Sequence, residues 1–588
     1  MTVDSESSKD RKNAISRRNF IAGTVAGAAA LGAVAGATTL LPHVAATPAA
    51  AGLKAQPAGI PSGWDYTTDV VVVGYGGAGA VTAITAYDAG AQVLVLEKAP
   101  IEGGGNSRMS GGFISYCKPE NVQAAAMDLY TACWGLTPMD ICEAWANQIA
   151  LTPAWLTKMG ILYSDLSAMG MPGGGSIGGS DFANFPGAAS TSSVDMTDKT
   201  NAFNAGGGIF FNWANGALAS RGIQILFNTR ANALVQDPNT GEILGVMAQD
   251  QGTIDKTIAI KANKAVVLCT GGMEYNEEMK DNYLRPYPIR GVGWMYNTGD
   301  GVKMAQAVGA DLWHMNLVCS AGTTFVSPAS PIGWWGMSFS NGSDIYVNRK
   351  GNRFMCENPL FNGGNGGTDA HRAFMGFGGW DFSDTQKDGR YLNVPFYLVF
   401  DEIFRKAGPL YSLTTIGNGV LPPELGGITT PWSKDNSAEI AAGWITTGAD
   451  IPTLAANLGQ GMDLDGYNTD IDATQLEATI TNWNAMCTAG VDTQYGRVIS
   501  AANAIVTPPY YAIVQYPSLY STNGGPRKNA QAQILDTNGN PIPRLYEAGS
   551  LGHTCANVYS LFGQNWAEIM AFGRIAGANA AAETNWTS

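Results

Sequence analysis

The most regular hydrophobic pattern of the chain lies between residues 69 and 97. An uninterrupted apolar run, DVVVV at Asp69–Val73, is followed by a glycine-rich turn, a stretch of small residues and a second apolar run that ends at Glu97. Uninterrupted apolar runs are typical of strands buried on both faces of a parallel sheet, whose strands need a crossover helix between them. The pattern therefore predicts a strand, turn, helix and strand unit of an α/β fold.

The turn of this unit has glycines where a bound dinucleotide needs them. Gly74, Gly76 and Gly79 form GxGxxG: the first turns the chain, the second lets the backbone meet a pyrophosphate, and the third lets the helix pack on the strand. The phosphates would lie at the helix N-terminus. Glu97 would accept hydrogen bonds from the ribose hydroxyls and repel a 2′-phosphate, which disfavours NADP.

The N-terminal segment has the features of an export signal. The twin arginine at Arg17 and Arg18 precedes a weakly hydrophobic run of Ala and Gly and then small residues suited to cleavage near Ala46 to Ala51. A membrane anchor or an amphipathic helix is the alternative, but the run is poor in Leu, Ile and Phe and has no polar face. We expect residues 1–51 to be a twin-arginine signal peptide, read by the twin-arginine export machinery. The protein would then reach the periplasm or the outer face of the cytoplasmic membrane.

Composition adds limits on size and partners. A chain of 588 residues exceeds what one hydrophobic core usually serves, so we expect at least two domains. The 74 glycines predict many tight turns and close backbone approaches to a ligand. A formal charge of -14 argues against nucleic acid or an anionic membrane surface as a partner. The eight cysteines include no CxxC, so neither a zinc knuckle nor covalent c-type haem is encoded, and we expect mostly buried free thiols.

A glycine-rich segment directly after the acidic strand end favours FAD over NAD. This segment, APIEGGGNSRMSGG at 99–112, suits a backbone that runs along the diphosphate and the flavin ring. With it, the chain resembles the flavoprotein family of fumarate reductase, soluble flavocytochrome c and 3-ketosteroid dehydrogenase. The resemblance recurs at 266–276, 297–312, 521–536 and 544–581.

The resemblance implies an α/β fold in which a Rossmann-like doubly wound FAD-binding domain carries an inserted α+β cap domain. The first part of the FAD-binding domain would span 66–316, the cap 317–507 and the second part 508–588. The residues expected to bind FAD are Gly74, Gly76, Gly77, Ala78, Gly79, Glu97, Lys98, Gly104, Gly105, Asn106, Ser110, Gly111, Gly112, Thr270, Gly271, Gly272, Asp300, Glu547 and Asn565.

The position that carries the proton donor in these relatives is changed. The opening of the stretch RFMCENPLFNGGNGG at 353–367 resembles the turn that leads to an arginine in fumarate reductases and to a tyrosine in ketosteroid dehydrogenases. Here that position is Phe361, which cannot donate a proton. The paired histidines of the dicarboxylate site fall at Tyr520 and Ser521, and its arginine falls near Leu561. Fumarate would lose charge-assisted hydrogen bonds worth about 1.5–3 kcal/mol each, so fumarate reduction is not expected.

The steroid-type comparison fits better near the C-terminus. Tyr559 and Gly563 fall where ketosteroid dehydrogenases place the tyrosine and the backbone N–H that hold the substrate carbonyl. Two such donors can stabilise an enolate-like oxyanion. The alternative is that Tyr559 only packs the loop. The segment from Gly563 is predicted to be a long helix of small residues. The positive N-terminal end of this helix would suit the electron-rich edge of a reduced flavin. The alternative is an ordinary helix that only packs against the rest of the protein.

Several residues are candidates for the second proton. They are Tyr116, Tyr520, His371, Arg372 and His553. A neutral tyrosine can donate a proton but needs a nearby cation to act as a base, and Arg372 or Arg527 could be that neighbour, although Arg527 is equally compatible with a surface position.

These expectations define a function. We expect an FAD-dependent oxidoreductase that reduces, or forms, a C=C bond conjugated to a carbonyl in an apolar or aromatic substrate, such as a steroid-like or phenylpropenoid enone. Phe361, Trp334, Trp335 and Trp380 give the cap its aromatic character. A fumarate- or urocanate-type acrylate reductase with Arg372 in its pocket is one alternative, and a flavin-binding electron-relay protein is another. The sequence has one dinucleotide motif and no haem motif, so we expect an external electron donor such as a c-type cytochrome or a quinol-linked membrane protein.

Overall fold

The computed structural model describes most of the chain after the predicted signal peptide. The described residues are 57–167, 180, 182, 184–196, 206–252, 256–285, 287–319, 323–327, 330–336, 342–357, 391–411, 423–425, 427, 428, 430–458, 471–561 and 563–586. The chain divides into two units, Met1–Leu53 and Lys54–Ser588, and all described residues belong to the second. The predicted signal peptide with Arg17 and Arg18 lies outside the described residues, and so do Phe361, His371, Arg372 and Trp380.

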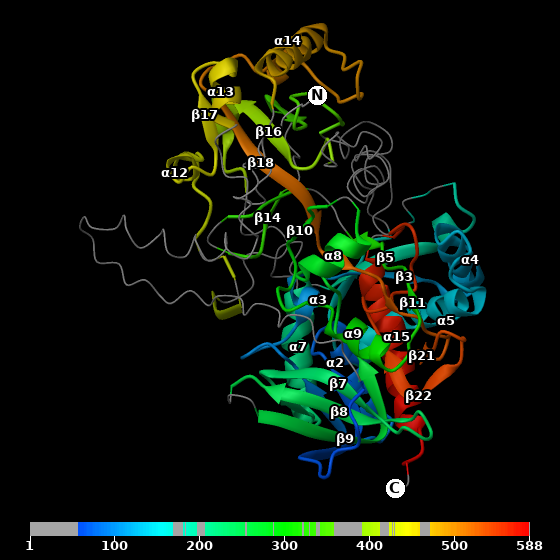
Figure 1. Ribbon diagram of the computed structural model, residues 1–588. Coiled ribbons are helices and arrows are strands. Elements are labelled where there is room, and N and C mark those ends of the chain that lie inside the picture. The colour runs from blue at the N-terminus through cyan, green and yellow to red at the C-terminus, as the bar shows by residue number, and fades with distance from the viewer. Residues whose placement is uncertain are drawn as a thin grey trace, which may run out of the picture. The chain divides into compact units, whose positions relative to one another are not determined.

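An eight-stranded sheet is built around the predicted dinucleotide unit (Figure 1). Strands β22, β9, β1, β2 and β6 lie side by side and are parallel to one another. Antiparallel strands extend this block: β21 pairs with β22, and β7 and β8 form a ribbon on β9. The strands are β1 (Tyr66–Val73), β2 (Val93–Leu96), β6 (Gln224–Leu226), β7 (Thr229–Gln236), β8 (Ile243–Asp250), β9 (Lys256–Leu268), β21 (Gln533–Leu535) and β22 (Pro541–Glu547).

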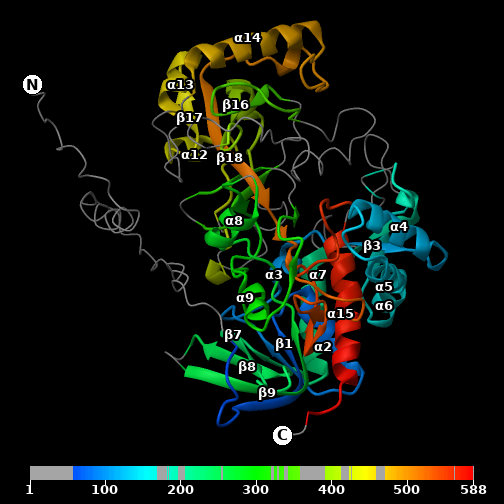
Figure 2. The ribbon, with the colours of Figure 1, turned by 45° about the vertical axis from the view of Figure 1, so that its right-hand side comes forward.

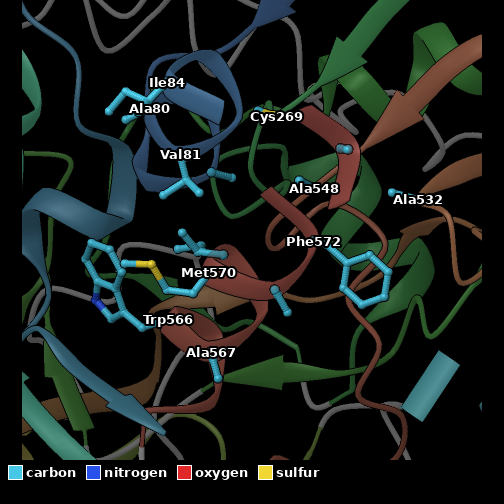
Figure 3. Close-up of a cluster of buried hydrophobic side chains, with 14 of the residues drawn as sticks. Ala80, Val81, Ile84, Cys269, Ala532, Ala548, Trp566, Ala567, Met570 and Phe572 are labelled. Carbon is cyan, nitrogen blue, oxygen red and sulfur yellow. The ribbon is translucent and has the colours of Figure 1, made fainter. Parts of the chain in front are cut away.

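The buried faces of this sheet explain the uninterrupted apolar runs. Val70 and Val72 pack into one core cluster, whereas Val71 and Val73 pack into the cluster on the other face. The first cluster contains helices α2 (Gly77–Asp88), α7 (Gly206–Ser220) and α15 (Gln564–Ala582), and Figure 2 shows α15 beside α2 and α7. Figure 3 shows Val81 of α2 facing α15. The predicted strand and helix unit is thus confirmed.

A second sheet has seven strands. In the sequence, these strands come after β9 and before β21 of the first sheet. The central strand of the second sheet, β18, pairs with β13, β16, β17 and β10, while β14 extends it at β13 and β15 at β16. These strands are β10 (Arg290–Gly291), β13 (Thr323–Phe325), β14 (Trp334–Gly336), β15 (Asp344–Val347), β16 (Phe396–Asp401), β17 (Thr446–Gly448) and β18 (Tyr510–Leu519). Most of these strands fall inside the predicted cap, and the exact boundaries at 317 and 507 stay a prediction.

The second sheet has its own cores. Aromatic side chains fill one face, including the buried Trp334, and aliphatic side chains with Trp483 fill the other. The helices of this part are α11 (Glu402–Ala407), α12 (Ser437–Ala441), α13 (Ile451–Leu458) and α14 (Ala473–Ala489). Of the four aromatic residues that the sequence analysis named for the cap, Trp334 thus belongs to the hydrophobic core.

Small sheets and helices complete the described part of the chain. The remaining strands are β3 (Phe113–Cys117), β4 (Tyr163–Asp165), β5 (Thr191–Met196), β11 (Leu312–Trp313), β12 (Val318–Cys319), β19 (Ser521–Thr522) and β20 (Gly525–Pro526). The remaining helices are α3 (Gly105–Met109), α4 (Val122–Ala132), α5 (Met139–Ala150), α6 (Thr152–Lys158), α8 (Glu277–Tyr283) and α9 (Asp300–Ala307). Among the described residues, no helix is both long enough and apolar enough to cross a membrane.

Candidate active site

The turn between β1 and α2 has the geometry that its glycines predicted. Gly74 has a φ of +103°, and a side chain on Gly79 would overlap the carbonyl oxygen of Gly74. Gly76 differs, because a Cβ there would meet no protein atom closer than 3.6 Å. Packing of the protein therefore requires a glycine at 74 and 79, whereas a Cβ at Gly76 would make only ordinary contact with the Gly104 backbone.

Glu97 is held in place by the backbone beside this turn. Its carboxylate accepts hydrogen bonds from the Tyr75 N–H at 2.9 Å and from the Ala99 N–H at 2.8 Å. Burial raises the pKa of Glu97 above its ordinary value, although these two hydrogen bonds oppose the shift. The carboxylate is thus oriented before any ligand arrives, as a ribose acceptor requires.

Three charged side chains form a cluster next to Glu97. Lys98 Nζ lies 2.9 Å from Asp300 Oδ2, and Arg230 makes two hydrogen bonds to the same carboxylate at 2.7 and 3.0 Å. Burial alone would raise the pKa of Asp300, but the two cations lower it to about 2. Asp300 therefore joins the end of β2 to the start of α9 and to the strand β7.

A pocket with about 780 Å³ of free space, open solvent included, lies along these residues. The predicted FAD-binding residues that line it are Gly74, Gly76, Gly77, Ala78, Glu97, Lys98, Gly105, Asn106, Thr270, Gly271 and Asp300. The buried Thr270 hydroxyl has no hydrogen-bond partner among the described residues, so it is available to a polar ligand group. This hydroxyl and the backbone of Gly76, which also lines the pocket, fit a dinucleotide.

Other lining residues were missed by the sequence analysis. They are Ser107, Thr229, Arg230, Trp294, Tyr296, Asn297, Ser550 and Ile569, together with apolar and backbone neighbours of the predicted set. Ser107 and Asn297 lie within segments that the resemblance had marked, and Ser107 Oγ accepts a hydrogen bond from the Gly77 N–H at 3.0 Å. Arg230 is the second residue of β7, and no local sequence pattern indicates a role for it.

The remaining predicted cofactor residues do not line this pocket. They are Gly79, Gly104, Ser110, Gly111, Gly112, Gly272, Glu547 and Asn565. Ser110 accepts a hydrogen bond from the Trp566 indole at 2.7 Å, and Gly111 and Gly112 contact the start of α7. Glu547 lies 3.0 Å from the buried Lys528. These contacts join the segments that surround the pocket, and direct contact of these residues with FAD stays a prediction.

Asn106 connects the pocket to a buried carboxyl group. Its amide donates to the Tyr520 carbonyl at 2.7 Å and to Glu274 Oε1 at 3.2 Å, and its Oδ1 accepts from the Trp294 N–H at 2.6 Å. Glu274 also accepts from the Thr522 N–H at 2.9 Å. Burial raises the pKa of Glu274 to about 7, and these hydrogen bonds oppose the shift without cancelling it.

Replacing Glu274 by glutamine should make stability less dependent on pH. A folded pKa of about 7 lies above the ordinary value of 4.5, so the folded state binds the proton more tightly than the unfolded state. The wild type should therefore lose about 3 kcal/mol of unfolding free energy as pH rises from 4.5 to 7 through this group alone. Glu274→Gln should remove this loss and be at least as stable as the wild type at pH 8. Denaturant unfolding at pH 5 and 8 measures it, with the exposed Glu278→Gln as a control; equal pH dependence in all three proteins would contradict the expectation.

The loop before the last helix brings Tyr559, Gly563 and Asn565 together. Gly563 is the N-cap residue of α15 with a φ of +90°, which confirms the predicted start of that helix. The Asn565 N–H donates to the Tyr559 hydroxyl oxygen at 3.0 Å, and the Asn565 side chain bonds Ser521 and Asn523. Burial raises the pKa of Tyr559 well above its ordinary value, so the phenol is neutral and can donate its proton.

Other candidate proton donors have different surroundings. Tyr116 donates to Asp165 Oδ2 at 2.9 Å, and burial together with this carboxylate raises its pKa to about 12. The Tyr520 hydroxyl is buried, which raises its pKa well above the ordinary value. His553 is fully buried, accepts a hydrogen bond from the Cys555 N–H at 2.8 Å and has its pKa lowered to about 4 by burial, so it is neutral near pH 7. Arg527 is partly exposed and lies 3.6 Å from Asp311, which matches its surface alternative.

The described part of the stretch at 353–367 belongs to a buried ion network. Arg353 makes two hydrogen bonds to Glu357 at 2.6 and 2.7 Å and one to Asp492 at 2.7 Å. Arg497 lies 3.4 Å from Glu357 and 3.1 Å from Asp344. The one carboxylate of this stretch is therefore part of the interior of the second sheet's domain.

Comparison with known proteins identifies the cofactor that this pocket binds. The model of a family described as FAD binding domain matches residues 69–564, which include both parts of the first sheet and the whole second sheet. The chain belongs to the FAD binding domain family. Its cofactor is FAD, and the protein is an FAD-dependent oxidoreductase with the inserted cap that the sequence predicted.

Individual known proteins are similar to this chain over most of its length. Digoxin reductase of Eggerthella lenta is 27% identical, with 98% of this chain and 97% of that protein covered. Urocanate reductase of the same organism is 26% identical over 89% of this chain and 76% of its own length. The crystal structure of 3-ketosteroid delta1-dehydrogenase from Sterolibacterium denitrificans has a TM-score of 0.66 at 20% identity, covering 88% of this chain and 99% of that one, and it shows the shared fold.

Proposed function

We propose that this protein reduces a C=C bond conjugated to a carbonyl group in an apolar or aromatic substrate. The observation that carries the proposal is the buried, neutral Tyr559 phenol at the N-terminus of α15, beside segments that also surround the FAD pocket. When bound, FAD supplies hydride chemistry at its isoalloxazine ring. The similarity to a digoxin reductase and to a urocanate reductase supports a reaction at a C=C bond.

Tyr559 and Gly563 would bind the substrate's carbonyl oxygen. The phenol donates one hydrogen bond, and the N-terminus of α15 contributes backbone N–H groups and a positive helix end. Negative charge grows on that oxygen as a conjugated C=C bond is reduced, so fixed donors here favour the transition state over the ground state.

The site described so far suits one carbonyl better than two carboxylates. The positions that hold cations in fumarate reductases by the resemblance are occupied by Tyr520, Ser521 and residues near Leu561, and none of these is charged. Burying a carboxylate without a cationic partner is costly. This favours an enone, steroid-like or phenylpropenoid, over fumarate.

Reoxidation of the reduced protein tests the function directly. Holoprotein reduced anaerobically with stoichiometric dithionite should regain the absorbance of oxidised flavin when mixed with benzylideneacetone, cinnamaldehyde or testosterone. The saturated ketone benzylacetone is the matched control and should leave the spectrum unchanged. Reoxidation by fumarate or urocanate alone would identify an acrylate reductase instead. Failure of every compound would leave an electron-relay protein and overturn the proposal.

Location and electron supply belong to the same proposal. The twin arginine and the Ala/Gly run support export through the twin-arginine pathway, and fractionation of cells that produce the full chain tests it. Outside the cytoplasm, reducing equivalents would come from a c-type cytochrome or a quinol-linked membrane protein, because the sequence carries a single dinucleotide motif.

A further inference from the structure

A buried carboxyl group, Asp195, lies in the small sheet next to the proposed carbonyl-binding loop. This sheet has the strand order β3, β5, β4, and Asp195 of β5 is paired with Phe113 of β3. The other edge of β3 contacts the loop. The Ser115 N–H donates to the Gly563 carbonyl at 3.3 Å, and a Cβ built on Gly563 would lie 2.8 Å from the Phe113 carbonyl oxygen. One strand therefore separates Asp195 from Gly563, and Figure 1 shows β3 and β5 beside the start of α15.

The face of the sheet that carries Asp195 is polar and buried. Side chains alternate between the two faces along a strand, and residues directly opposite each other share a face. Ser115 and Ser193, which are paired with each other, therefore share the face of Asp195, and both are fully buried. Ile114 and Val194 lie on the opposite face and pack into the first hydrophobic core. Asp195 is thus shielded from water by a surface that is not part of that core.

The carboxyl group of Asp195 is not held by a protein partner. Only 5% of the residue is exposed, and its Oδ1 has no hydrogen-bond partner among the described residues. Burial alone raises the pKa of Asp195 to about 6. A buried carboxyl group without a hydrogen bond or a cation favours its protonated form, which is the form that a proton donor needs.

The neighbouring elements place no charged group against Asp195. Tyr116 of β3 and Tyr163 and Asp165 of β4 lie on the opposite face of the sheet by the strand register. Cys117 shares the face but lies at the far end of β3. The helix α7, which packs against β5, has no titratable side chain. The proton affinity of Asp195 is therefore set by its burial.

We propose that Asp195 is the acid that donates the second proton of the reaction. This inference rests on the proposed function, in which Tyr559 and the start of α15 hold the carbonyl oxygen. The β carbon of the C=C bond receives a hydride from the reduced cofactor, the electron pair of the π bond moves to the α carbon, and the α carbon takes the Asp195 proton. The carboxylate left behind regains a proton from water. Phe361, at the position of the donor in the resembling families, cannot supply this proton.

The spacing of the strands fits this role. Adjacent strands lie about 4.8 Å apart, so the backbones of Asp195 and Gly563, on the two sides of β3, are about 10 Å apart. A carbonyl oxygen bound at Gly563 lies about 3 Å from its donor. The α carbon lies about 2.5 Å beyond that oxygen. An aspartate side chain and one hydrogen bond can span the remaining distance of about 5 Å.

Asp195→Asn should slow the reoxidation of the reduced holoprotein by benzylideneacetone about 10²–10³-fold, because an amide cannot donate the proton. The Kd of the ketone for the oxidised holoprotein, measured by the perturbation of flavin absorbance, should stay within about twofold. Asp195→Glu restores a carboxyl group and should recover about tenfold of the lost rate. The second-order rate of the wild type should fall as pH rises above about 6, because the acid must be protonated, and Asp195→Asn should lack this fall.

Stability distinguishes an acid from a residue that only supports the fold. The folded pKa of about 6 lies above the ordinary value of 3.8, so the wild type should lose unfolding free energy as pH rises from 3.8 to 6. Asp195→Asn should remove this loss and be at least as stable as the wild type at pH 8 in denaturant unfolding. The control is Asp140→Asn, because Asp140 is exposed in the first turn of α5. This control should match the wild type in rate and Kd.

The outcomes separate this proposal from the proposed function. Reoxidation of Asp195→Asn within twofold of the wild-type rate, or an unchanged fall of its rate above pH 6, would overturn the role of Asp195. Weaker binding at a normal rate would overturn it too, since Asp195 would then only bind the substrate. In each of these cases the wild type still reduces the ketone, and the proposed function stands. A wild type that no carbonyl compound reoxidises would overturn the proposed function as well.

Discussion

Tyr559→Phe should lower kcat for an accepted enone by about 10²–10³, with a smaller change in KM. The substitution removes one hydrogen-bond donor to the oxygen on which charge develops, and loss of one such donor in comparable sites costs about 3–4 kcal/mol. The ring remains, so the loop keeps its apolar packing. Steady-state kinetics of the purified holoprotein with benzylideneacetone measures the effect.

Stability separates the chemical effect from a structural one. The Asn565 N–H loses its acceptor at 3.0 Å in this variant, which should cost about 1 kcal/mol of unfolding free energy and leave the protein folded and flavin-bound. Tyr87→Phe is the control, because Tyr87 is exposed at the end of α2. Unchanged kinetics of Tyr559→Phe on every accepted compound would contradict the assignment of this phenol to the substrate carbonyl.

Gly79→Ala should yield a protein that retains little or no FAD. A methyl group at this position overlaps the carbonyl oxygen of Gly74, and that oxygen belongs to the turn that must stay in place for the pyrophosphate. Overpacking of a rigid interior costs up to about 3 kcal/mol, which corresponds to roughly a hundredfold loss of affinity. The flavin-to-protein absorbance ratio after purification and equilibrium titration with added FAD measure the loss.

A second helical glycine provides the comparison. Gly216 lies in α7, and a Cβ built there meets no atom within 4 Å. Gly216→Ala should keep a full complement of flavin and gain up to about 1 kcal/mol of stability, because alanine is the better helix former. A Gly79→Ala protein with flavin content equal to that of Gly216→Ala would show that the turn tolerates a side chain, contrary to the packing described above.

The sequence by itself determined the cofactor unit. Asp69 to Glu97 could be interpreted because every requirement is local: apolar runs for buried strands, glycines where the backbone turns or closes on itself, and an acidic residue directly after the second strand. The start of the last helix could also be predicted from the sequence, because Gly563 provides the positive φ at which the preceding loop ends. Local sequence is sufficient where chain neighbours supply the geometry.

Only the tertiary structure decided which distant side chains meet around that unit. Arg230 reaches Asp300 and Asn106 reaches Glu274, and the two residues of each pair are far apart in sequence. The same long-range packing placed Glu547 beside the buried Lys528 instead of along the pocket. Hydrophobic periodicity specifies that a face is buried but not which partner covers it, so these contacts follow from the folded arrangement and not from any local motif.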